Sequence, residues 1–346
     1  MGTYDLQTNK TTEHFVGDID LPDEWNVGLI VGRSGTGKTT IARELFGDCI
    51  IDGYEYTHES ILDDMPKDAS VAEITAALSS VGFASPPSWL KSYAMLSNGE
   101  KMRCDLARAM LEKRDVFCFD EFTSVVDRTV AKVGSFAIQK AIRRGGQKFI
   151  AVTCHADVEE WLMPDWVFNT DTMTFSVKDL AEQKKNRPGI RLDIVETRRK
   201  SQYWQMFRKY HYLSDDFNRA ARVWVVFANG ALAAFVSVLP QPCTVKNLFR
   251  FHRVVVFPDY QGVGIGTKSM ETVAQIFKDE GKKISILSSN IALIRGLQKN
   301  KKFILSRFGR NRTGKLYGKA LQKTMAGLFN NRGCGERITA TFDYVG

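Results

Sequence analysis

The sequence predicts an α/β chain of two domains, the second of them of the α+β type. A short apolar run, Val27 to Val31, ends in a glycine-rich turn that leads into a helix. A second apolar run, Val254 to Val256, also precedes a glycine-rich turn and a helix. The net charge changes sign between the two halves of the chain, which indicates domains with different partners.

The charge asymmetry places the domain boundary. Residues 1–180 carry 18 Lys and Arg against 28 Asp and Glu, whereas residues 181–346 carry 30 against 11. The polar segment 178–190 contains Pro188 and Gly189, so we expect domains at 1–180 and 191–346 joined by a linker at 181–190. No apolar run approaches the roughly 20 residues of a membrane helix. The six cysteines are scattered, which fits a reducing, cytoplasmic location without a membrane partner.

The turn after the first strand has the pattern G-x-x-x-x-G-K-T of a phosphate loop. Its glycines let backbone N–H groups converge on phosphates, Lys38 supplies a positive charge, and Thr39 offers a hydroxyl to Mg²⁺. The helix expected from Thr40 to Phe46 points its positive end at the same anion. We therefore expect a nucleotide to bind residues of the loop and the first helical turn: Gly32, Arg33, Ser34, Gly35, Thr36, Gly37, Lys38, Thr39 and Thr40.

Four later segments resemble ABC ATPases in their order and spacing. Leu96–Glu100 is similar to the signature motif, Asp115–Glu121 to the Walker B strand, Ser124–Asp127 to the D-loop, and Thr153–His155 to the switch-histidine loop. The resemblance covers residues 13–177. It implies ATP and Mg²⁺ as ligands.

The chemistry of nucleotide hydrolysis assigns roles to these segments. Asp120 can hold Mg²⁺ through water, together with Thr39, because a hard cation prefers oxygen ligands. Glu121 is placed to orient or deprotonate the attacking water. The resemblance implies that His155 contacts the γ-phosphate and the water, and that Asp127 belongs to the ATP site.

The signature motif predicts an ATP-dependent homodimer. In ABC ATPases this motif contacts the γ-phosphate of ATP held by another subunit, which implies that role for Ser97 and Gly99. The chain has one phosphate loop and one signature, so its simplest partner is a second copy. Asn98 replaces the usual glycine, Glu100 replaces the glutamine of transporters, and no Q-loop glutamine occurs between the loop and the signature. The short intervening arm counts against transport.

The second glycine-rich turn follows a predicted hairpin. Apolar strands at 222–227 and 231–239 are joined by Asn229-Gly230, and a helix is expected from Thr267. The Q-x-x-G-x-G pattern resembles the GNAT cofactor motif, in which backbone N–H groups bind the pyrophosphate of CoA. The resemblance implies acetyl-CoA or another acyl-CoA as cofactor, bound by Gln261, Gly262, Val263, Gly264, Ile265, Gly266 and Thr267.

Two histidines are candidates for acting on the substrate, because the tyrosine that GNAT enzymes often use as general acid is not matched. His252 precedes the motif strand, and His211 lies in the aromatic, basic stretch 203–213; each also fits a structural or surface role. The His211-Tyr212 pair is similar to that of phage Mom DNA-modification enzymes. The architecture is identified as a member of the ABC ATPase–acetyltransferase fusions of phage and archaeal genomes, which implies host cytoplasm for a phage protein.

The chain is most basic between Arg295 and Lys323, with ten Lys or Arg and no acid. Phe303, Phe308 and Tyr317 interleave, which suits phosphate-backbone binding with base stacking; the alternative is a solvated surface. We expect an ATP-driven acyltransferase that modifies a base amine of DNA or RNA. Two alternatives remain: an ATP-gated N-acetyltransferase of protein or small-molecule amines, and a non-catalytic, ATP-switched DNA-binding protein.

Overall fold

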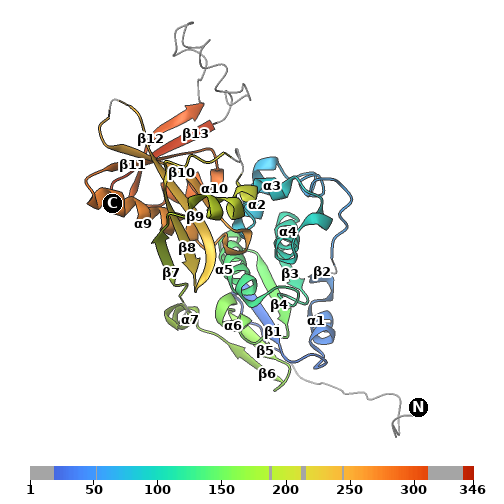
Figure 1. Cartoon of the computed structure of the whole chain (residues 1–346). Helices are drawn as coiled ribbons and strands as arrows, with labels where there is room; N and C mark the ends of the chain where they lie inside the picture. Colours follow the sequence, from blue (N-terminus) through green and yellow to red (C-terminus); the bar gives the residue numbers. More distant parts are fainter. Residues whose placement is uncertain (1–18, 52, 187–188, 212–215, 244, 311–337) are drawn as a thin grey trace, which may run out of the picture.

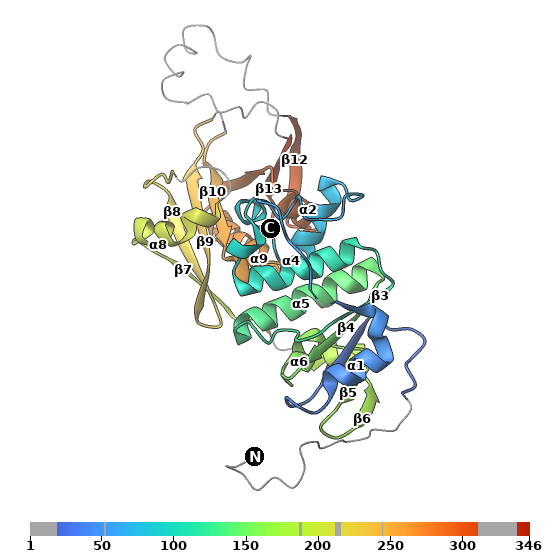
Figure 2. The same cartoon turned by 90° about the vertical axis from the view of Figure 1, so that its right-hand side faces the viewer.

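Two sheets, with helices between them, form the frame of the molecule in the computed structural model (Figure 1). The structure describes residues 19–51, 53–186, 189–211, 216–243, 245–310 and 338–346, and the statements below refer to these residues. Helices α4 (Asn98–Leu111) and α5 (Arg128–Gly145) lie between the two sheets in both views (Figures 1 and 2). Among these residues, no helix combines the length and the apolar character that crossing a bilayer requires.

The N-terminal sheet has the strand order β2-β3-β4-β1-β5-β6. All neighbouring pairs are parallel except β5 and β6. The central strand β1 is buried along its whole length, as its continuous apolar sequence predicts. The strands are β1 (Val27–Val31), β2 (Ile50–Ile51), β3 (Val116–Phe119), β4 (Lys148–Thr153), β5 (Trp166–Asn169) and β6 (Thr174–Val177).

Two long helices of this module begin at side-chain caps. The hydroxyl of Ser97 accepts from the backbone N–H of Glu100, whose carboxylate accepts from the N–H of Ser97, and this capping box starts α4. The Asp127 carboxylate caps α5 by accepting from the N–H groups of Thr129 and Val130. The remaining elements are α1 (Lys38–Phe46), η1 (Gly47–Cys49), α2 (Val71–Ser80), α3 (Pro86–Trp89), η2 (Tyr93–Met95) and α6 (Val158–Leu162).

The C-terminal sheet has the order β12-β13-β11-β10-β9-β8-β7. Only β10 and β11 pair in parallel; the other pairs are antiparallel. Asn229 and Gly230 have φ values of 50° and 86°, so the predicted hairpin turn is confirmed. The strands are β7 (Leu192–Glu196), β8 (Arg222–Ala228), β9 (Ala231–Pro240), β10 (Leu248–Val256), β11 (Lys283–Ser288), β12 (Phe303–Arg310) and β13 (Ile338–Tyr344).

Helices α8 (Lys200–Phe207) and α9 (Ile265–Asp279) cover opposite faces of this sheet (Figure 2). Helix α9 begins two residues before the expected Thr267, because Gly264 caps it with a left-handed φ of 90°. The predicted linker contains a short helix, α7 (Leu180–Asn186). The remaining elements are η3 (Arg208–Tyr210), η4 (Pro258–Tyr260) and α10 (Ile291–Gln298).

The two modules share apolar packing. Val133 of α5 is buried in the core of the C-terminal sheet, together with Tyr260 and Ile265. Val263 of the second glycine turn, in the C-terminal module, likewise packs on a cluster that includes Phe136 of α5. The segment before α9 is therefore held by helices of the N-terminal module.

Candidate functional site

Three of the predicted nucleotide-binding segments meet at one edge of the N-terminal sheet. Strands β3, β4 and β1 are neighbours and run in parallel. Asp120 follows β3, His155 follows β4, and the phosphate loop follows β1. Because carboxyl ends of parallel strands share an edge, the sheet places these segments at the same edge.

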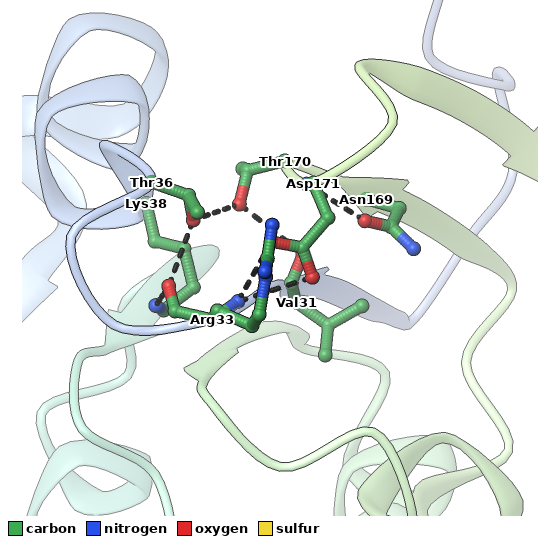
Figure 3. Close-up of polar contacts among 7 residues, drawn as sticks. All are labelled: Val31, Arg33, Thr36, Lys38, Asn169, Thr170 and Asp171. Atoms are coloured by element: carbon green, nitrogen blue, oxygen red, sulfur yellow. Dashed lines mark hydrogen bonds and ion pairs between the residues drawn. The ribbon is translucent and has the colours of Figure 1, made fainter.

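The phosphate loop is closed by its own lysine (Figure 3). Lys38 begins α1 and is buried, and its Nζ donates a 2.6 Å hydrogen bond to the carbonyl oxygen of Arg33. Gly35 and Gly37 have φ values of 85° and 81°, which lets the backbone wrap around this amine. A β-carbon on Gly35 would meet nothing within 4 Å, so the loop is open on that side. The loop can therefore admit an anion beside a buried positive charge.

Two residues after β5 contact the loop, and the sequence analysis missed them (Figure 3). The Asp171 carboxylate accepts from the backbone N–H and the Nε of Arg33, and these bonds lower the pKa of Asp171. The hydroxyls of Thr170 and Thr36 lie 2.6 Å apart. No local motif marks Thr170 or Asp171; only the pairing of β5 with β1 indicates that they reach the loop.

The two carboxylates after β3 differ in their surroundings. Asp120 Oδ1 accepts a 2.8 Å hydrogen bond from the backbone N–H of Glu121. Glu121 is exposed and adopts a left-handed φ of 53°, with its carbonyl oxygen accepting from the Ser124 hydroxyl. A non-glycine residue in this conformation is uncommon and frequently marks a functional position. The backbone N–H of His155 donates to Thr153 Oγ1. This bond fixes the backbone and does not involve the half-buried imidazole.

The signature residues lie apart from the phosphate loop of the same chain. Among the described residues, no hydrogen bond or ion pair joins Ser97 or Gly99 to that loop. Asn98 Nδ2 instead donates to the carbonyl oxygen of Val125, which ties the signature to the segment before Asp127.

The second glycine turn opens onto a cavity of about 270 Å³. Gly264 has space beside it, because a β-carbon there would meet nothing within 4 Å. The first N–H groups of α9 have no partner within the helix and are free for an anion. Lys268, which the sequence analysis also missed, brings a positive charge to the same cavity. Its lining residues are Gly189, Ile190, Leu192, Val263, Gly264, Ile265 and Lys268.

Gln261 and Gly262, at the start of the same turn, face the N-terminal module. Gln261 Oε1 accepts from the N–H of Ala84, and its Nε2 donates to the carbonyl oxygen of Val256. A β-carbon on Gly262 would lie 2.6 Å from the Cα of Gly82. Of the predicted cofactor residues, those from Val263 onward therefore border the cavity, whereas Gln261 and Gly262 form a contact between modules.

The strand before the turn separates from its parallel neighbour. Strand β10 pairs with β11 only from Leu248 to Arg250, although β10 continues to Val256. A register shift against β9 between Phe251 and Arg253 marks a bulge at His252. Beyond Arg250, β10 thus has no strand paired with it on the β11 side among the described residues.

The two candidate histidines converge on one aromatic cluster. The His252 ring lies 6.2 Å from that of Phe217, and the His211 ring lies 5.7 Å from that of Trp204. Trp204 and Phe217 are themselves stacked at 5.6 Å. Burial, and to a smaller extent the charge of Arg253, lower the pKa of His252 to about 4, so its imidazole is neutral at pH 7.

The basic region is described only in part. Arg295, Lys299, Lys301 and Arg307 are exposed, whereas Lys302 forms a 2.7 Å ion pair with Glu271. Phe308 is 61% exposed on the edge strand β12, and Phe303 is buried. Tyr317, Lys323 and the other basic residues after Arg310 lie outside the described residues, as does Tyr212.

Comparison with known proteins supports both modules. Residues 188–300 match the sequence model of the acetyltransferase (GNAT) family. The chain is 34% identical over 119 residues to the yeast protein "[NU+] prion formation protein 1", which covers 28% of this chain and 10% of that protein. It is 28% identical over 198 residues to the aliphatic sulfonates import ATP-binding protein SsuB 2 of Rhodococcus jostii, covering 49% of this chain and 77% of that protein.

A solved acetyltransferase of Bacillus subtilis in complex with CoA is 14% identical, covers 45% of this chain and 98% of its own, and superimposes with a TM-score of 0.32. The chain spans about a tenth of the length of the first curated relatives. The relatives that resemble ABC ATPases match the N-terminal part. The chain therefore carries a C-terminal acetyltransferase domain of the GNAT family behind an N-terminal module similar to ABC ATPases.

Proposed function

We propose that the protein is an ATP-dependent N-acyltransferase that modifies an amine of nucleic acid. The observation that carries the proposal is the presence of two glycine turns with room for an anion, one beside the buried amine of Lys38 and one opening on the cavity beside Gly264. Each turn begins a helix whose N-terminal N–H groups favour phosphate oxygens.

The first turn would bind the phosphates of ATP. Lys38 would exchange its bond to the Arg33 carbonyl for a bond to phosphate, and Glu121 would orient or deprotonate the attacking water. Among the described residues, no three His, Cys, Asp or Glu side chains cluster as a metal site. The oxygens of Thr39 and Asp120 nevertheless fit Mg²⁺, which keeps several waters and takes phosphate oxygens as ligands. Mg²⁺ bound there would neutralise phosphate charge.

The exposed surface around the signature supports a second copy as partner. Met95, two residues before Ser97, and Val125, whose carbonyl oxygen accepts from Asn98 Nδ2, are 69% and 64% exposed. Large apolar side chains at such positions fit an interface that forms only when ATP bridges two copies.

The second turn would bind acyl-CoA, with the pyrophosphate at the N-terminus of α9 near Lys268. The part of β10 beyond its pairing with β11 could hydrogen-bond the extended arm of the cofactor. The nitrogen of the acceptor amine would bond to the acyl carbon while the carbon–sulfur bond breaks, and the amine proton would leave to a base. His252 is the proposed base, because it is neutral at pH 7 and its Nε2 has no hydrogen-bond partner among the described residues.

Nucleic acid as the substrate is supported by the net charge of +19 over residues 181–346 and by the exposed basic residues near Phe308. The test incubates the full chain with acetyl-CoA, Mg-ATP and single-stranded DNA, duplex DNA or RNA. It measures thiol release and analyses the digested nucleosides by mass spectrometry. We expect an acetylated nucleoside, and we expect binding that falls steeply with salt because counterions are released.

Two double variants, one in each module, change the net charge by the same amount and serve as test and control. Lys299→Glu with Lys301→Glu should weaken binding and reduce the salt slope, whereas Lys67→Glu with Lys91→Glu, exposed in the N-terminal module, should not. Acetylation of added polyamines or peptides but not nucleosides would favour the small-molecule or protein alternative. ATPase stimulation by DNA without any thiol release would favour the non-catalytic one.

A further inference from the structure

The acetyltransferase domain places a carboxylate against the signature motif. Asp259, in η4, lies so close to Gly99 that a β-carbon on this glycine would be 3.5 Å from Asp259 Oδ1. Gly99 is buried between this carboxylate and Val130 of α5. A residue of the C-terminal domain therefore borders the place where, in the proposed dimer, the nucleotide of the other subunit would contact Ser97 and Gly99.

Behind Asp259 lies a guanidinium whose hydrogen bonding is incomplete. Arg103 is fully buried on the signature helix α4, and its Nη2 donates a 3.3 Å hydrogen bond to the Asp259 carbonyl oxygen. Its Nη1 lies 3.8 Å from Asp259 Oδ1, too far for a hydrogen bond, and its Nε has no acceptor among the described residues. A buried charge is costly unless it is paired and hydrogen-bonded, and a shift of Asp259 toward Arg103 would complete the ion pair.

Asp259 is connected to the cofactor turn through a rigid contact. Gln261 is fixed at both ends of its amide, by Ala84 in one module and by Val256 in the other. Gly82 and Gly262 touch backbone to backbone, and a β-carbon on Gly82 would lie 2.7 Å from the carbonyl oxygen of Gln261. The turn can hardly move alone, so a shift of Asp259 is transmitted to Val263 and Gly264, which line the cavity.

We propose that Arg103 and Asp259 link ATP bound at the signature motif to acyl-CoA bound at the second glycine turn, so that each ligand tightens the binding of the other. The phosphate charge arriving at Gly99 repels the Asp259 carboxylate, which moves onto Arg103 and completes the ion pair. Because the turn moves only together with Asp259, this shift places it in the arrangement that binds CoA, and the population of that arrangement rises. This inference rests on the two binding sites of the proposed function.

The test measures the Kd of CoA by calorimetry on the full chain carrying Glu121→Gln, with and without saturating Mg-ATP. We expect Mg-ATP to lower the Kd of CoA by at least about fivefold, and CoA to lower the Kd of ATP by the same factor, since coupling is reciprocal. When Asp259→Asn or Arg103→Gln is added to the Glu121→Gln protein, both ligands should still bind. The Kd of CoA should then be about the same with and without Mg-ATP.

Glu280→Gln is the matched control, because it removes a carboxylate of an Arg222 ion pair in the same domain but away from the interface. It should leave the coupling intact. Melting curves identify any variant that fails to fold. If Arg103→Gln does not fold, the test rests on Asp259→Asn, which keeps the shape of the side chain. If both ligands bind but Mg-ATP leaves the Kd of CoA unchanged or raises it, the proposed coupling through Arg103 and Asp259 is wrong, whereas the two binding sites remain supported. If the parent protein binds neither ATP nor CoA, the proposed function fails together with the link.

Discussion

The amine of Lys38 donates a 2.6 Å hydrogen bond to the carbonyl oxygen of Arg33, five residues earlier in the chain. The lysine thus occupies the interior of its own phosphate loop, held there by a carbonyl that ATP would replace with a stronger, charged acceptor. Lys38→Ala should raise the Kd of ATP about 10- to 100-fold, because hydrogen bonds to charged groups contribute about 1.5–3 kcal/mol. Fluorescent-nucleotide titration measures this. Lys67→Ala, an exposed lysine of the same module, is the control, and an equal loss in both variants would contradict the assignment.

Glu121 is exposed, has a left-handed backbone, and is proposed to activate water rather than to bind the nucleotide. Glu121→Gln should keep the affinity for ATP and lose hydrolysis, because the amide cannot take a proton from water. With hydrolysis blocked, a dimer held by two nucleotides should accumulate, and sedimentation velocity should detect it. A monomeric Glu121→Gln protein at saturating Mg-ATP would argue against the nucleotide-bridged dimer.

Gly264 and Gly281 lie at the two ends of α9 and offer a matched pair. Both have left-handed φ values, 90° and 72°, and a β-carbon on either would meet nothing within 4 Å. Gly264→Glu should abolish the rise in melting temperature that CoA causes in the full chain, since the new carboxylate enters the pyrophosphate site. Gly281→Glu has the same strain and charge but should keep the CoA effect. If CoA raised the melting temperature of neither variant, the loss could not be assigned to the turn, and the proposed pyrophosphate site at Gly264 would be contradicted.

His252 predicts a particular loss of stability in acid. Burial lowers its pKa from the ordinary 6.5 to about 4, so the unfolded state takes up a proton at pH values where the folded state does not. The free energy of unfolding should therefore fall as the pH drops from about 6.5 to about 4. Urea denaturation at pH 7 and pH 5 should show a smaller loss in His252→Gln than in the parent protein. Equal losses would mean that the imidazole titrates normally.

The strand–turn–helix units were predictable because each depends on neighbouring residues. The run Val27–Val31 followed by glycines gives β1 and the phosphate loop, and Asn229-Gly230 gives the hairpin. The start of α9 was displaced because a left-handed glycine can cap a helix, a choice that the pattern alone leaves open. Local chemistry thus determined the elements and most of the phosphate loop.

Contacts between distant segments were not predictable in the same way. Arg103 and Asp259 are 156 residues apart, and Arg33 and Asp171 are 138 apart, with no motif that pairs them. Gln261 matches the cofactor pattern, yet its amide is used between modules. The roles of such residues follow from the order of strands and the packing of α4 and α5, which a single sequence does not specify.

The burial of Val133 of α5 in the core of the C-terminal sheet has a consequence for how the chain is made. During synthesis, α5 leaves the ribosome more than a hundred residues before η4, which packs against it. Until then the outer face of α5 is an exposed apolar surface, of the kind that chaperones recognise and that promotes aggregation. Once the second sheet has folded against it, neither module can unfold without exposing the core of the other. The two modules are thus expected to melt in a single cooperative transition, and a gene cut at the linker should yield two fragments that are poorly stable by themselves.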